Sequence, residues 1–437
     1  MNRKYLIEGG CTLQGEITVR GAKNAVTKQM VASLLASGTT QLRNVPDIGD
    51  VDITRRILTS LGCSLIHHPD DGTLAIDASS LNTHEVPAQY SGLNRIPILL
   101  AGVLLNRFGR AVIPVMGGCD IGARPIDFHL DGLRKLGATI DYHDGAYHFE
   151  AKRLHGTRIT LPFPSVGATE NLIMAAVMAH GTTEIRNAAV EPEIVDLALL
   201  LQAMGAIISQ ETDRTWVIQG VDNLHATNHR VLNDRIEAAS FAVSAIATGG
   251  DVLIKGADQF HLLTFLNWLR LAGGEFETRE DGIRFFGGEA KLRPIAVETG
   301  VHPGLMTDWQ QPLVILMTQA KGMSVIHETV YENRFGYVDA LNRMGAHIQL
   351  FKECLGSRDC RFRHLSHKHS AVILGPTPLR GADIEIPDLR AGFSYLVAAA
   401  LAQGRTTLRG VGYIERGYDR VVDKFRALGL PIQVVDE

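Results

Sequence analysis

The sequence is poor in cysteine, carries few aromatic residues and lacks any long hydrophobic run. Its five cysteines are too few and too scattered for the disulfide framework of a small secreted protein, so we expect free thiols. The longest apolar run, Ile96 to Leu105, is about half of what a bilayer crossing needs, and the start of the chain, MNRKYLIEGG, lacks the apolar stretch of a secretory signal. We therefore expect a cytoplasmic protein that does not act at a membrane.

An excess of positive charge is also missing. The chain has 43 Lys and Arg against 47 Asp and Glu, a formal net charge of −4. It therefore has neither the global field nor the aromatic interleaving that attracts nucleic acid, and any anionic ligand must be bound by local clusters of cations. What the chain does have is length: 437 residues, 45% hydrophobic and 21% charged, are enough for two hydrophobic cores.

Internal repetition is the strongest signal in the sequence. An apolar helical stretch that ends in glycine before a strand-like run recurs through the chain, and a second series of the same kind interleaves with it. The glycines of the first series are Gly38, Gly109, Gly181, Gly249, Gly322 and Gly404, and those of the second are Gly62, Gly137, Gly205, Gly273, Gly345 and Gly429. Each glycine is predicted to end a helix in the left-handed conformation and to be followed by a strand.

The repeat length defines the expected domains. Both series step by about 70 residues, except for a last interval of 82 to 84 residues that contains an insertion around ECLGSRDCRFRHLSHKHS. Six strand-helix repeats predict an α/β protein with three repeats in each of two domains. We expect one domain over residues 21–232 and a second made of residues 1–20 and 233–437. Two chain crossings make a hinge, so we also expect a cleft that closes on a ligand.

Polar residues recur at one position of the repeats, fourteen residues before each glycine of the first series. This position holds Asn24 (beside Lys23), Arg95, Gly167, Arg235, Asp308 and Arg390. Each is predicted to begin a helix, where free N–H groups and the helix dipole favour anions. Loops of the second series add Cys119, Arg124, Arg334 and Arg416. The pattern indicates a site for a multiply charged anion, although any single arginine is more often solvated or paired with a surface carboxylate.

Nine strings in order carry a resemblance to a known family. They are RGAKNA, GGCDIGARPIDFH, SVGATENLIMAA, EPEIVDL, VLNDRIEA, HPGLMTDWQ, VYENRF, DLRAGF and IERGYDR. Together they resemble the enolpyruvyl transferases that act on UDP-N-acetylglucosamine in bacterial cell-wall synthesis, almost from end to end. The resemblance implies the enolpyruvyl transferase fold shared with 5-enolpyruvylshikimate-3-phosphate synthase, which consists of two inside-out α/β domains of three repeats each.

The implied reaction moves the enolpyruvyl group of phosphoenolpyruvate onto the 3-hydroxyl of the sugar in UDP-N-acetylglucosamine and releases phosphate. By similarity, the phosphate ligands of phosphoenolpyruvate are Lys23, Arg124 and Arg416. The resemblance likewise implies that Arg334 and Arg390 bind the carboxylate of phosphoenolpyruvate, since guanidinium groups suit bidentate contacts with a carboxylate. The resemblance implies no cofactor and no metal.

Two carboxylates are candidates for proton transfer. Asp308 is the candidate base for the sugar hydroxyl, as the one acidic residue at the repeat position that otherwise carries mostly cations. Asp388 lies close in sequence to Arg390, in PDLR, and is expected to relay protons or to orient that arginine.

Cys119 is the candidate acid that protonates C3 of phosphoenolpyruvate. A free thiol has a pKa of about 8.5 and is largely protonated at neutral pH, whereas neighbouring arginines favour the thiolate. The same group should therefore also act as a nucleophile, in keeping with alkylation of this family by epoxides such as fosfomycin. The glycines Gly117, Gly118 and Gly122 are expected to let this loop close over the substrate as a lid.

The nucleotide contacts are likewise implied by the resemblance. They are Asn24, Arg95, Pro125, Ile126, Asp127, Phe128, Ser165, Val166, Gly167, Asp308 and Val330. The string SVGATEN also makes independent sense as a diphosphate cradle, because a small hydroxyl and a glycine before a helix bring backbone N–H groups within reach of phosphate oxygens.

Other functions stay open at this stage. Met306, Trp309, Phe393 and Tyr395 depart from the family pattern, which leaves room for an acceptor that is another uridine nucleotide. A non-catalytic UDP-sugar-binding paralogue is a second alternative, although it would be expected to have lost Cys119, Asp308 or an arginine of the set. A shikimate-pathway synthase is not expected to carry the cysteine loop. Assembly into a homo-oligomer is left open.

The insertion raises the question of a metal. Cys354 and Cys360 are followed by His364, His367 and His369, and two thiolates with two imidazoles can make a closed zinc site. The step between the cysteines is wider than in usual zinc knuckles. We therefore expect a cation-rich hairpin here, with a subunit contact as a further option, and no metal site.

Overall fold

The computed structural model describes residues 3–116, 125–287, 291–356 and 360–436. The described residues fall into two compact units. Unit 1 comprises residues 3–20 and 233–436, and unit 2 comprises residues 21–116 and 125–232. Among these residues, every helix is too short or too polar to span a bilayer.

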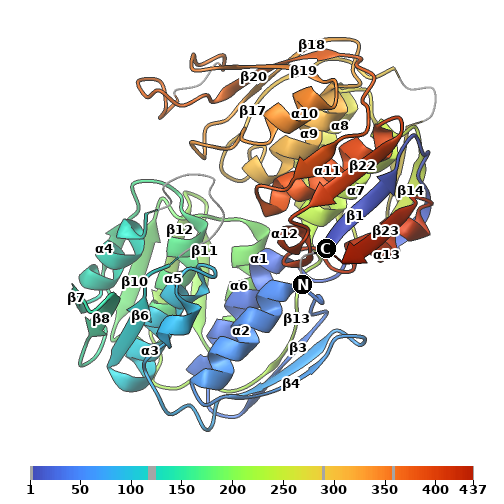
Figure 1. The fold of residues 1–437 in the computed structure, drawn as a ribbon. Coiled ribbons are helices and arrows are strands. Elements are labelled where there is room, and N and C mark those ends of the chain that lie inside the picture. Colours follow the sequence, from blue (N-terminus) through green and yellow to red (C-terminus); the bar gives the residue numbers. More distant parts are fainter. Residues whose placement is uncertain (1–2, 117–124, 288–290, 357–359, 437) are drawn as a thin grey trace. The chain divides into compact units, whose positions relative to one another are not determined.

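Figure 1 labels the helices of unit 2. They are α1 (Lys23–Ala32), α2 (Gly49–Ser60), α3 (Ile96–Phe108), α4 (Asp127–Lys135), α5 (Val166–Ala176) and α6 (Pro192–Ala203). Helix α3 is buried on every side from Ile96 to Leu105, as expected for a helix that is apolar all round. It packs closely on α5, since a Cβ added at Gly102 would lie 2.7 Å from the Cβ of Ala175.

Three sheets belong to unit 2. Their strand orders are β13-β3-β5-β4, β6-β8-β7 and β11-β12-β10-β9. The strands are β3 (Thr39–Arg43), β4 (Ser64–His68), β5 (Thr73–Asp77), β6 (Arg110–Pro114), β7 (Thr139–His143), β8 (Ala146–Glu150), β9 (Arg158–Thr160), β10 (Thr182–Arg186), β11 (Ile207–Glu211), β12 (Thr215–Gln219) and β13 (Asn228–Arg230). Burial alternates along strands such as β3, so one face of each sheet packs toward the helices.

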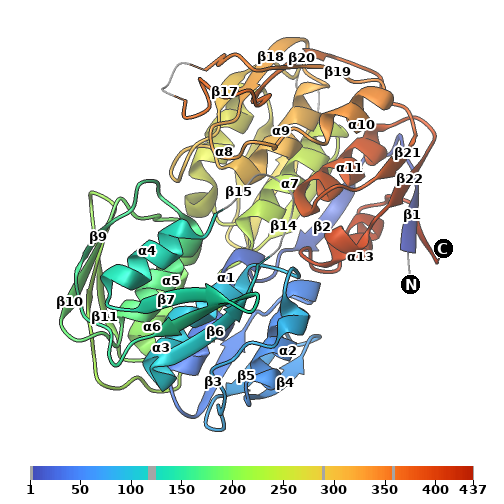
Figure 2. The ribbon, with the colours of Figure 1, turned by 60° about the vertical axis from the view of Figure 1, so that its left-hand side comes forward.

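Unit 1 repeats this plan. Its helices are α7 (Arg235–Ala247), α8 (Gln259–Leu271), α9 (Gln310–Met317), α10 (Val338–Arg343), α11 (Leu389–Leu401), α12 (Gly412–Glu415) and α13 (Val421–Ala427). Helices α7, α9 and α11 contact one another in the centre, and each is almost entirely buried. Phe241 and Phe393 meet there with ring centroids 5.0 Å apart. Figure 2 shows these three helices from a second direction.

Three further sheets belong to unit 1. Their strand orders are β15-β16-β14-β2, β17-β18-β20-β19 and β21-β22-β1-β23. The strands are β1 (Arg3–Glu8), β2 (Gln14–Thr18), β14 (Asp251–Lys255), β15 (Glu275–Thr278), β16 (Gly282–Phe286), β17 (Ala296–Glu298), β18 (Gly322–His327), β19 (His347–Phe351), β20 (Ser370–Gly375), β21 (Asp383–Glu385), β22 (Arg405–Arg409) and β23 (Ile432–Asp436). Strand β1 pairs with β22 and β23, and β2 pairs with β14.

The structure confirms the repeat pattern and the fold class. All twelve repeat glycines have positive φ, between 64° and 134°, which is the conformation that glycine tolerates best. Eight of them lie within two residues of a helix end, as predicted. The other four, Gly38, Gly181, Gly322 and Gly404, lie three to five residues beyond the preceding α- or 3₁₀-helix, in the turn into the next strand or at its first residue. Each described unit has helices at its centre and sheets outside, which is the inside-out α/β arrangement that the resemblance implied. The insertion links β19 and β20, which pair with each other in antiparallel register as a hairpin.

Candidate active site

The polar residues of the repeat position lie at the starts of the central helices. In unit 2, Lys23 and Asn24 open α1, Arg95 is the N-cap of α3, and Gly167 is the second residue of α5. In unit 1, Arg235 opens α7 and Arg390 is the second residue of α11. Asp308 lies in a short 3₁₀ turn (Thr307–Trp309) before α9. In each unit, three central helices therefore present charged or small residues at their N-terminal ends, where backbone N–H groups and the helix dipole favour anions.

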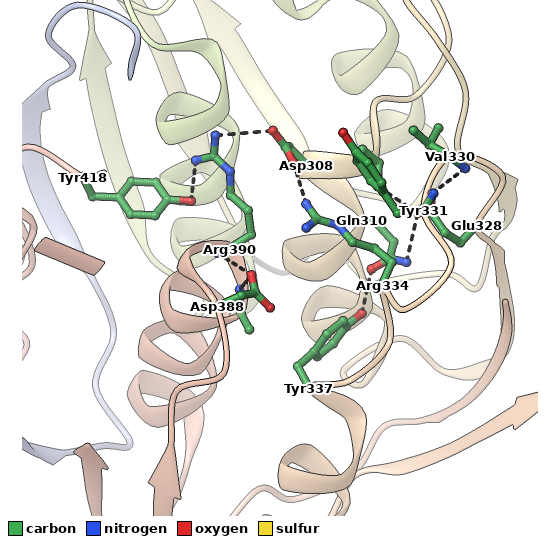
Figure 3. A network of polar contacts seen from close by, with 12 residues as sticks. Asp308, Gln310, Glu328, Val330, Tyr331, Arg334, Tyr337, Asp388, Arg390 and Tyr418 are labelled. Carbon is green, nitrogen blue, oxygen red and sulfur yellow. Dashed lines mark hydrogen bonds and ion pairs between the residues drawn. The ribbon is translucent and has the colours of Figure 1, made fainter. Parts of the chain in front are cut away.

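Arg334 and Arg390 both contact Asp308 in unit 1 (Figure 3). Arg334 Nη2 donates to Asp308 Oδ1 at 2.5 Å, and Arg390 Nη2 donates to Asp308 Oδ2 at 3.3 Å. The side chains of the two arginines are only 2% and 6% exposed, whereas that of Asp308 is 19% exposed. Two buried guanidinium groups thus converge on one carboxylate that solvent can still reach.

Arg390 is held by two further residues. Its Nη1 donates to the hydroxyl of Tyr418 at 2.9 Å, and Asp388 caps α11 by accepting the backbone N–H groups of Arg390 and Ala391. Burial opposes the charge of Arg390, but Tyr418 and Asp308 outweigh it and raise the pKa of the guanidinium. Burial also raises the pKa of Tyr418, to about 12, so its hydroxyl stays neutral and can accept this hydrogen bond.

Glu328 fixes the loop that carries Arg334. Its Oε1 accepts the backbone N–H groups of Val330 and Tyr331 at 2.7 and 3.1 Å. Its Oε2 accepts the hydroxyl of Thr307 at 2.9 Å and the amide of Gln310 at 3.2 Å. Burial raises the pKa of this fully buried carboxyl. Glu328 therefore ties the 330–334 loop to the turn that holds Asp308 (Figure 3).

Sequence reasoning missed both Glu328 and Tyr418. A signal for Glu328 was present, because a carboxylate that directly follows an apolar strand has to be neutralised or hydrogen-bonded. Tyr418 lies two residues beyond Arg416 within IERGYDR, and nothing local marks its contact with Arg390. Arg416 itself follows α12 and is half-buried.

Lys23 forms an ion pair at the start of α1 in unit 2. Its Nζ lies 2.8 Å from Asp50 Oδ2, at the first turn of α2. One turn further along α1, Lys28 Nζ donates to the backbone carbonyl of Asn24 at 2.7 Å. The buried carboxyl of Glu170 lies 3.9 Å from the same Nζ. Two lysines therefore stand on the first turns of α1, both with carboxylate neighbours.

Most of the predicted nucleotide contacts of unit 2 come from the starts of α3, α4 and α5. Arg95 donates to the carbonyl of Pro125 at 3.5 Å, just before Ile126, Asp127 and Phe128 begin α4. Ser165 caps α5 by accepting the N–H of Ala168, ahead of Val166 and Gly167. His129, in α4, contacts α5.

The His129 imidazole accepts the Asn171 side-chain amide at 3.1 Å. A Cβ added at Gly167 would lie 3.5 Å from the same ring. Burial, with a smaller contribution from Arg95, lowers the pKa of His129 to about 3, so the ring is neutral at pH 7. In unit 2, His129 is a residue that sequence reasoning missed.

Cys119 and Arg124 lie outside the described residues, as do Gly117, Gly118 and Gly122. Their assigned roles stay predictions.

Of the residues that depart from the family pattern, Trp309, Phe393 and Tyr395 are buried inside unit 1, whereas Met306 is half-buried. The Trp309 ring is 1% exposed and packs on Phe265 at 5.5 Å between centroids. Phe393 is fully buried and packs on Tyr418, and the buried Tyr395 donates its hydroxyl to the carbonyl of Tyr337 at 3.0 Å. These substitutions fill the core behind the Asp308 cluster.

Comparison with known proteins gives consistent matches along the chain. A family model described as EPSP synthase (3-phosphoshikimate 1-carboxyvinyltransferase) matches residues 7–425. The UDP-N-acetylglucosamine 1-carboxyvinyltransferase of Protochlamydia amoebophila (strain UWE25) is 49% identical over 437 residues, covering 99% of this chain and 94% of the relative. The protein of the same name from Chlamydia abortus (strain DSM 27085 / S26/3) is 48% identical over 431 residues, covering 98% and 97%.

Solved structures agree with these matches. The enolpyruvyl transferase NikO from Streptomyces tendae superposes with a TM-score of 0.87 at 25% identity, over 99% of both chains. An EPSP synthase from Acinetobacter baumannii superposes with a TM-score of 0.75 at 21% identity over 100% of both chains, which shows the shared fold alone. The resemblance drawn from the nine strings is thereby confirmed, and the chain belongs to the EPSP synthase family of enolpyruvyl transferases.

Proposed function

We propose that this chain transfers the enolpyruvyl group of phosphoenolpyruvate to the 3-hydroxyl of UDP-N-acetylglucosamine, with release of phosphate, in the synthesis of peptidoglycan precursors. Relatives that carry this activity in their name match nearly the whole chain at 45 to 49% identity. The observation within the structure that best supports the proposal is the pair of buried arginines on Asp308.

These two arginines already bind a carboxylate in the structure. Phosphoenolpyruvate brings a carboxylate of its own, and a guanidinium binds such a group through two parallel hydrogen bonds. We propose that Arg334 and Arg390 turn to the substrate carboxylate when it enters. Asp308 then loses two hydrogen-bond donors, which makes its carboxylate a better acceptor for the proton of the sugar hydroxyl.

Addition and elimination complete the reaction. As the sugar oxygen attacks C2, an acid delivers a proton to C3, and phosphate leaves when that proton or its equivalent is removed again. We assign the acid to Cys119 and the binding of the phosphate to Lys23, Arg124 and Arg416, as the resemblance implies. Asp388 acts through Arg390, whose backbone N–H it accepts.

The uridine nucleotide is assigned to the helix starts of unit 2. The proposed contacts, as the resemblance implies them, are Asn24, Arg95, the 125–128 segment, Ser165 to Gly167, Asp308 and Val330. Ser165 and Gly167 open α5, and an anion bound there gains from the free N–H groups of the first helical turn. The cytoplasmic location and any homo-oligomer stay predictions.

The acceptor is the part of this proposal that needs the sharpest test. Phosphate release should be followed with phosphoenolpyruvate and a panel of acceptors: UDP-N-acetylglucosamine, UDP-glucose, UMP and shikimate 3-phosphate. We expect turnover with UDP-N-acetylglucosamine and little with the rest. Turnover with UMP alone would move the function to another uridine nucleotide. Binding of UDP-N-acetylglucosamine without turnover would favour a non-catalytic paralogue.

A further inference from the structure

Four side chains that can ligate a metal gather at the end of β18 in unit 1. They are His327, Cys354, Cys360 and His369, and one ligand atom from each lies within 4.8 Å of all the others. His327 ends β18 and is paired in register with Ser370, the first residue of β20. The two cysteines come from the insertion. Strand pairing thus brings His327 to a cluster that lies well beyond it in the sequence.

The two imidazoles are oriented as metal ligands. His369 Nδ1 lies 2.8 Å from the carbonyl of His367, which can only accept, so Nδ1 carries the proton and Nε2 carries the lone pair. That Nε2 lies 3.3 Å from the sulfur of Cys354. His327 Nδ1 contacts the hydroxyl of Ser370 at 2.8 Å. Metal-binding histidines usually donate their second ring N–H to a neighbouring oxygen in this way.

His327 Nε2 gives an independent indication of a ligand. The residue is fully buried, and this nitrogen has no hydrogen-bond partner among the residues that the structure describes. A buried polar atom without a partner lowers stability, because the loss of its hydration is not compensated. A metal ion bound to this nitrogen would satisfy it.

The surroundings suit a closed structural site. Cys360 is 8% exposed, and its sulfur accepts the backbone N–H of Phe362 at 3.3 Å, a contact that stabilises a thiolate. The Phe362 ring, 1% exposed, covers His369 at 5.6 Å between centroids. On the other side, a Cβ added at Gly356 would lie 2.5 Å from the His327 ring. Gly356 therefore packs tightly against the His327 ring.

We infer that His327, Cys354, Cys360 and His369 bind one Zn²⁺ ion as a structural site. Two sulfurs and two imidazole nitrogens that lie close together match the tetrahedral coordination of zinc, in which neighbouring ligand atoms lie roughly 3.3–3.8 Å apart. Binding releases the two thiol protons to solvent. This inference reverses the expectation from spacing alone. Of the histidines in the insertion, His369 is a ligand and His364 and His367 are not.

The ion would fix the insertion to the loop that carries Arg334. Arg361, next to Cys360, donates to the backbone carbonyl of Val330 and lies 3.4 Å from Glu332. At the other end, His327 directly precedes Glu328, which holds the N–H groups of Val330 and Tyr331. A zinc ion would therefore brace the 330–334 loop from both sides, with no open coordination position for catalysis.

Metal content of the full-length protein tests the inference. The chain is produced in zinc-supplemented medium, dialysed against metal-free buffer without chelator and analysed by inductively coupled plasma mass spectrometry. We expect about one zinc ion per chain, falling below about one tenth in Cys354→Ser and in Cys360→Ser. Cys11→Ser is the matched control, since Cys11 is a free cysteine of the same unit outside the cluster, and it should keep the full zinc content.

A second measurement on the unmodified chain keeps the test valid if the variants fail to fold. After exchange of the metal for Co²⁺, the visible spectrum should show the intense bands of tetrahedral cobalt with thiolate charge transfer. A weak octahedral spectrum, zinc content below about one tenth per chain in the unmodified protein, or a Cys354–Cys360 disulfide in the isolated protein would each overturn the inference.

Discussion

Arg334 and Asp308 form a 2.5 Å ion pair in which the arginine is almost completely buried and the aspartate is not. A buried cation without its partner is strongly unfavourable, so we expect the arginine to keep a carboxylate beside it when the proposed substrate binds. In the structure that carboxylate is Asp308, and in the proposed complex it is the substrate. The pair therefore links substrate entry to the release of the proposed base.

Asp308→Asn tests this exchange. We expect kcat to fall by about a hundredfold or more, the usual contribution of a general base. The Kd of phosphoenolpyruvate should not rise, because the variant no longer has the carboxylate that competes with the substrate for both arginines. Steady-state kinetics and calorimetric titration measure the two effects separately.

The control for this variant is Asp383→Asn, which removes an exposed carboxylate paired with Arg409 in the same unit. It should leave both quantities unchanged. A kcat of Asp308→Asn within about threefold of the unmodified chain would exclude Asp308 as the base.

Tyr418→Phe tests the support of Arg390. The variant removes the hydroxyl that accepts from Arg390 Nη1 and leaves the ring that packs on Phe393. Loss of one hydrogen bond to a charged group, about 1.5 kcal/mol, should raise KM for phosphoenolpyruvate roughly tenfold. The KM for UDP-N-acetylglucosamine should change little.

Tyr395→Phe is the matched control, because Tyr395 is also buried in α11 but its hydroxyl donates to the carbonyl of Tyr337. Equal KM values for phosphoenolpyruvate in the two variants would argue against a role of Tyr418 in substrate binding.

Acid should destabilise the protein through His129. Burial lowers its pKa from 6.5 to about 3, so between these values the unfolded chain binds a proton that the folded chain does not. Stability from this group is complete above pH 6.5 and is lost as the pH falls toward 3, with a slope of up to about 1.4 kcal/mol per pH unit. Urea denaturation across this range measures the slope.

His129→Gln should flatten this pH dependence, since glutamine offers an acceptor for Asn171 and does not titrate. The exposed His143, replaced by glutamine, serves as control and should leave the slope as it is. An unchanged slope in His129→Gln would assign the acid sensitivity to other groups.

Cys119→Ser should lose most of the activity, because a serine hydroxyl is far too weak an acid to protonate C3 at neutral pH. Fosfomycin should add covalently to the unmodified chain, and peptide mass spectrometry should place the adduct on Cys119. Cys11→Ser should keep full activity and still be alkylated. Full activity of Cys119→Ser would remove the acid role.

Much of the fold could be predicted because the repeat glycines act locally. A helix that ends with positive φ favours glycine whatever surrounds it, so eight of the twelve repeat glycines marked helix ends to within two residues. The helix starts were likewise predictable from their distance to these glycines. What the sequence alone did not reveal are the contacts made by side chains from different repeats, such as Tyr418 with Arg390 or Glu328 with Thr307.

The metal cluster shows the same limit. Spacing drew attention to His364 and His367, which follow the cysteines closely, but His327 reaches the cluster only because β18 pairs with β20. A metal ligand that reaches its site only through strand pairing cannot be recognised from the residues next to it in the sequence. The same holds for His129, whose contacts with Asn171 and Gly167 join α4 to α5.

The pairing of β1 with β22 and β23 sets an order for folding during synthesis. All of unit 2 lies between residues 21 and 232, so its three sheets can assemble as soon as that stretch has left the ribosome. Strand β1 is translated before any of it, yet its partners come last. Strand β1 therefore lacks its partner strands through nearly the whole of translation. Because an unpaired strand can pair with another chain, we expect β1 to need protection from aggregation in the nascent chain.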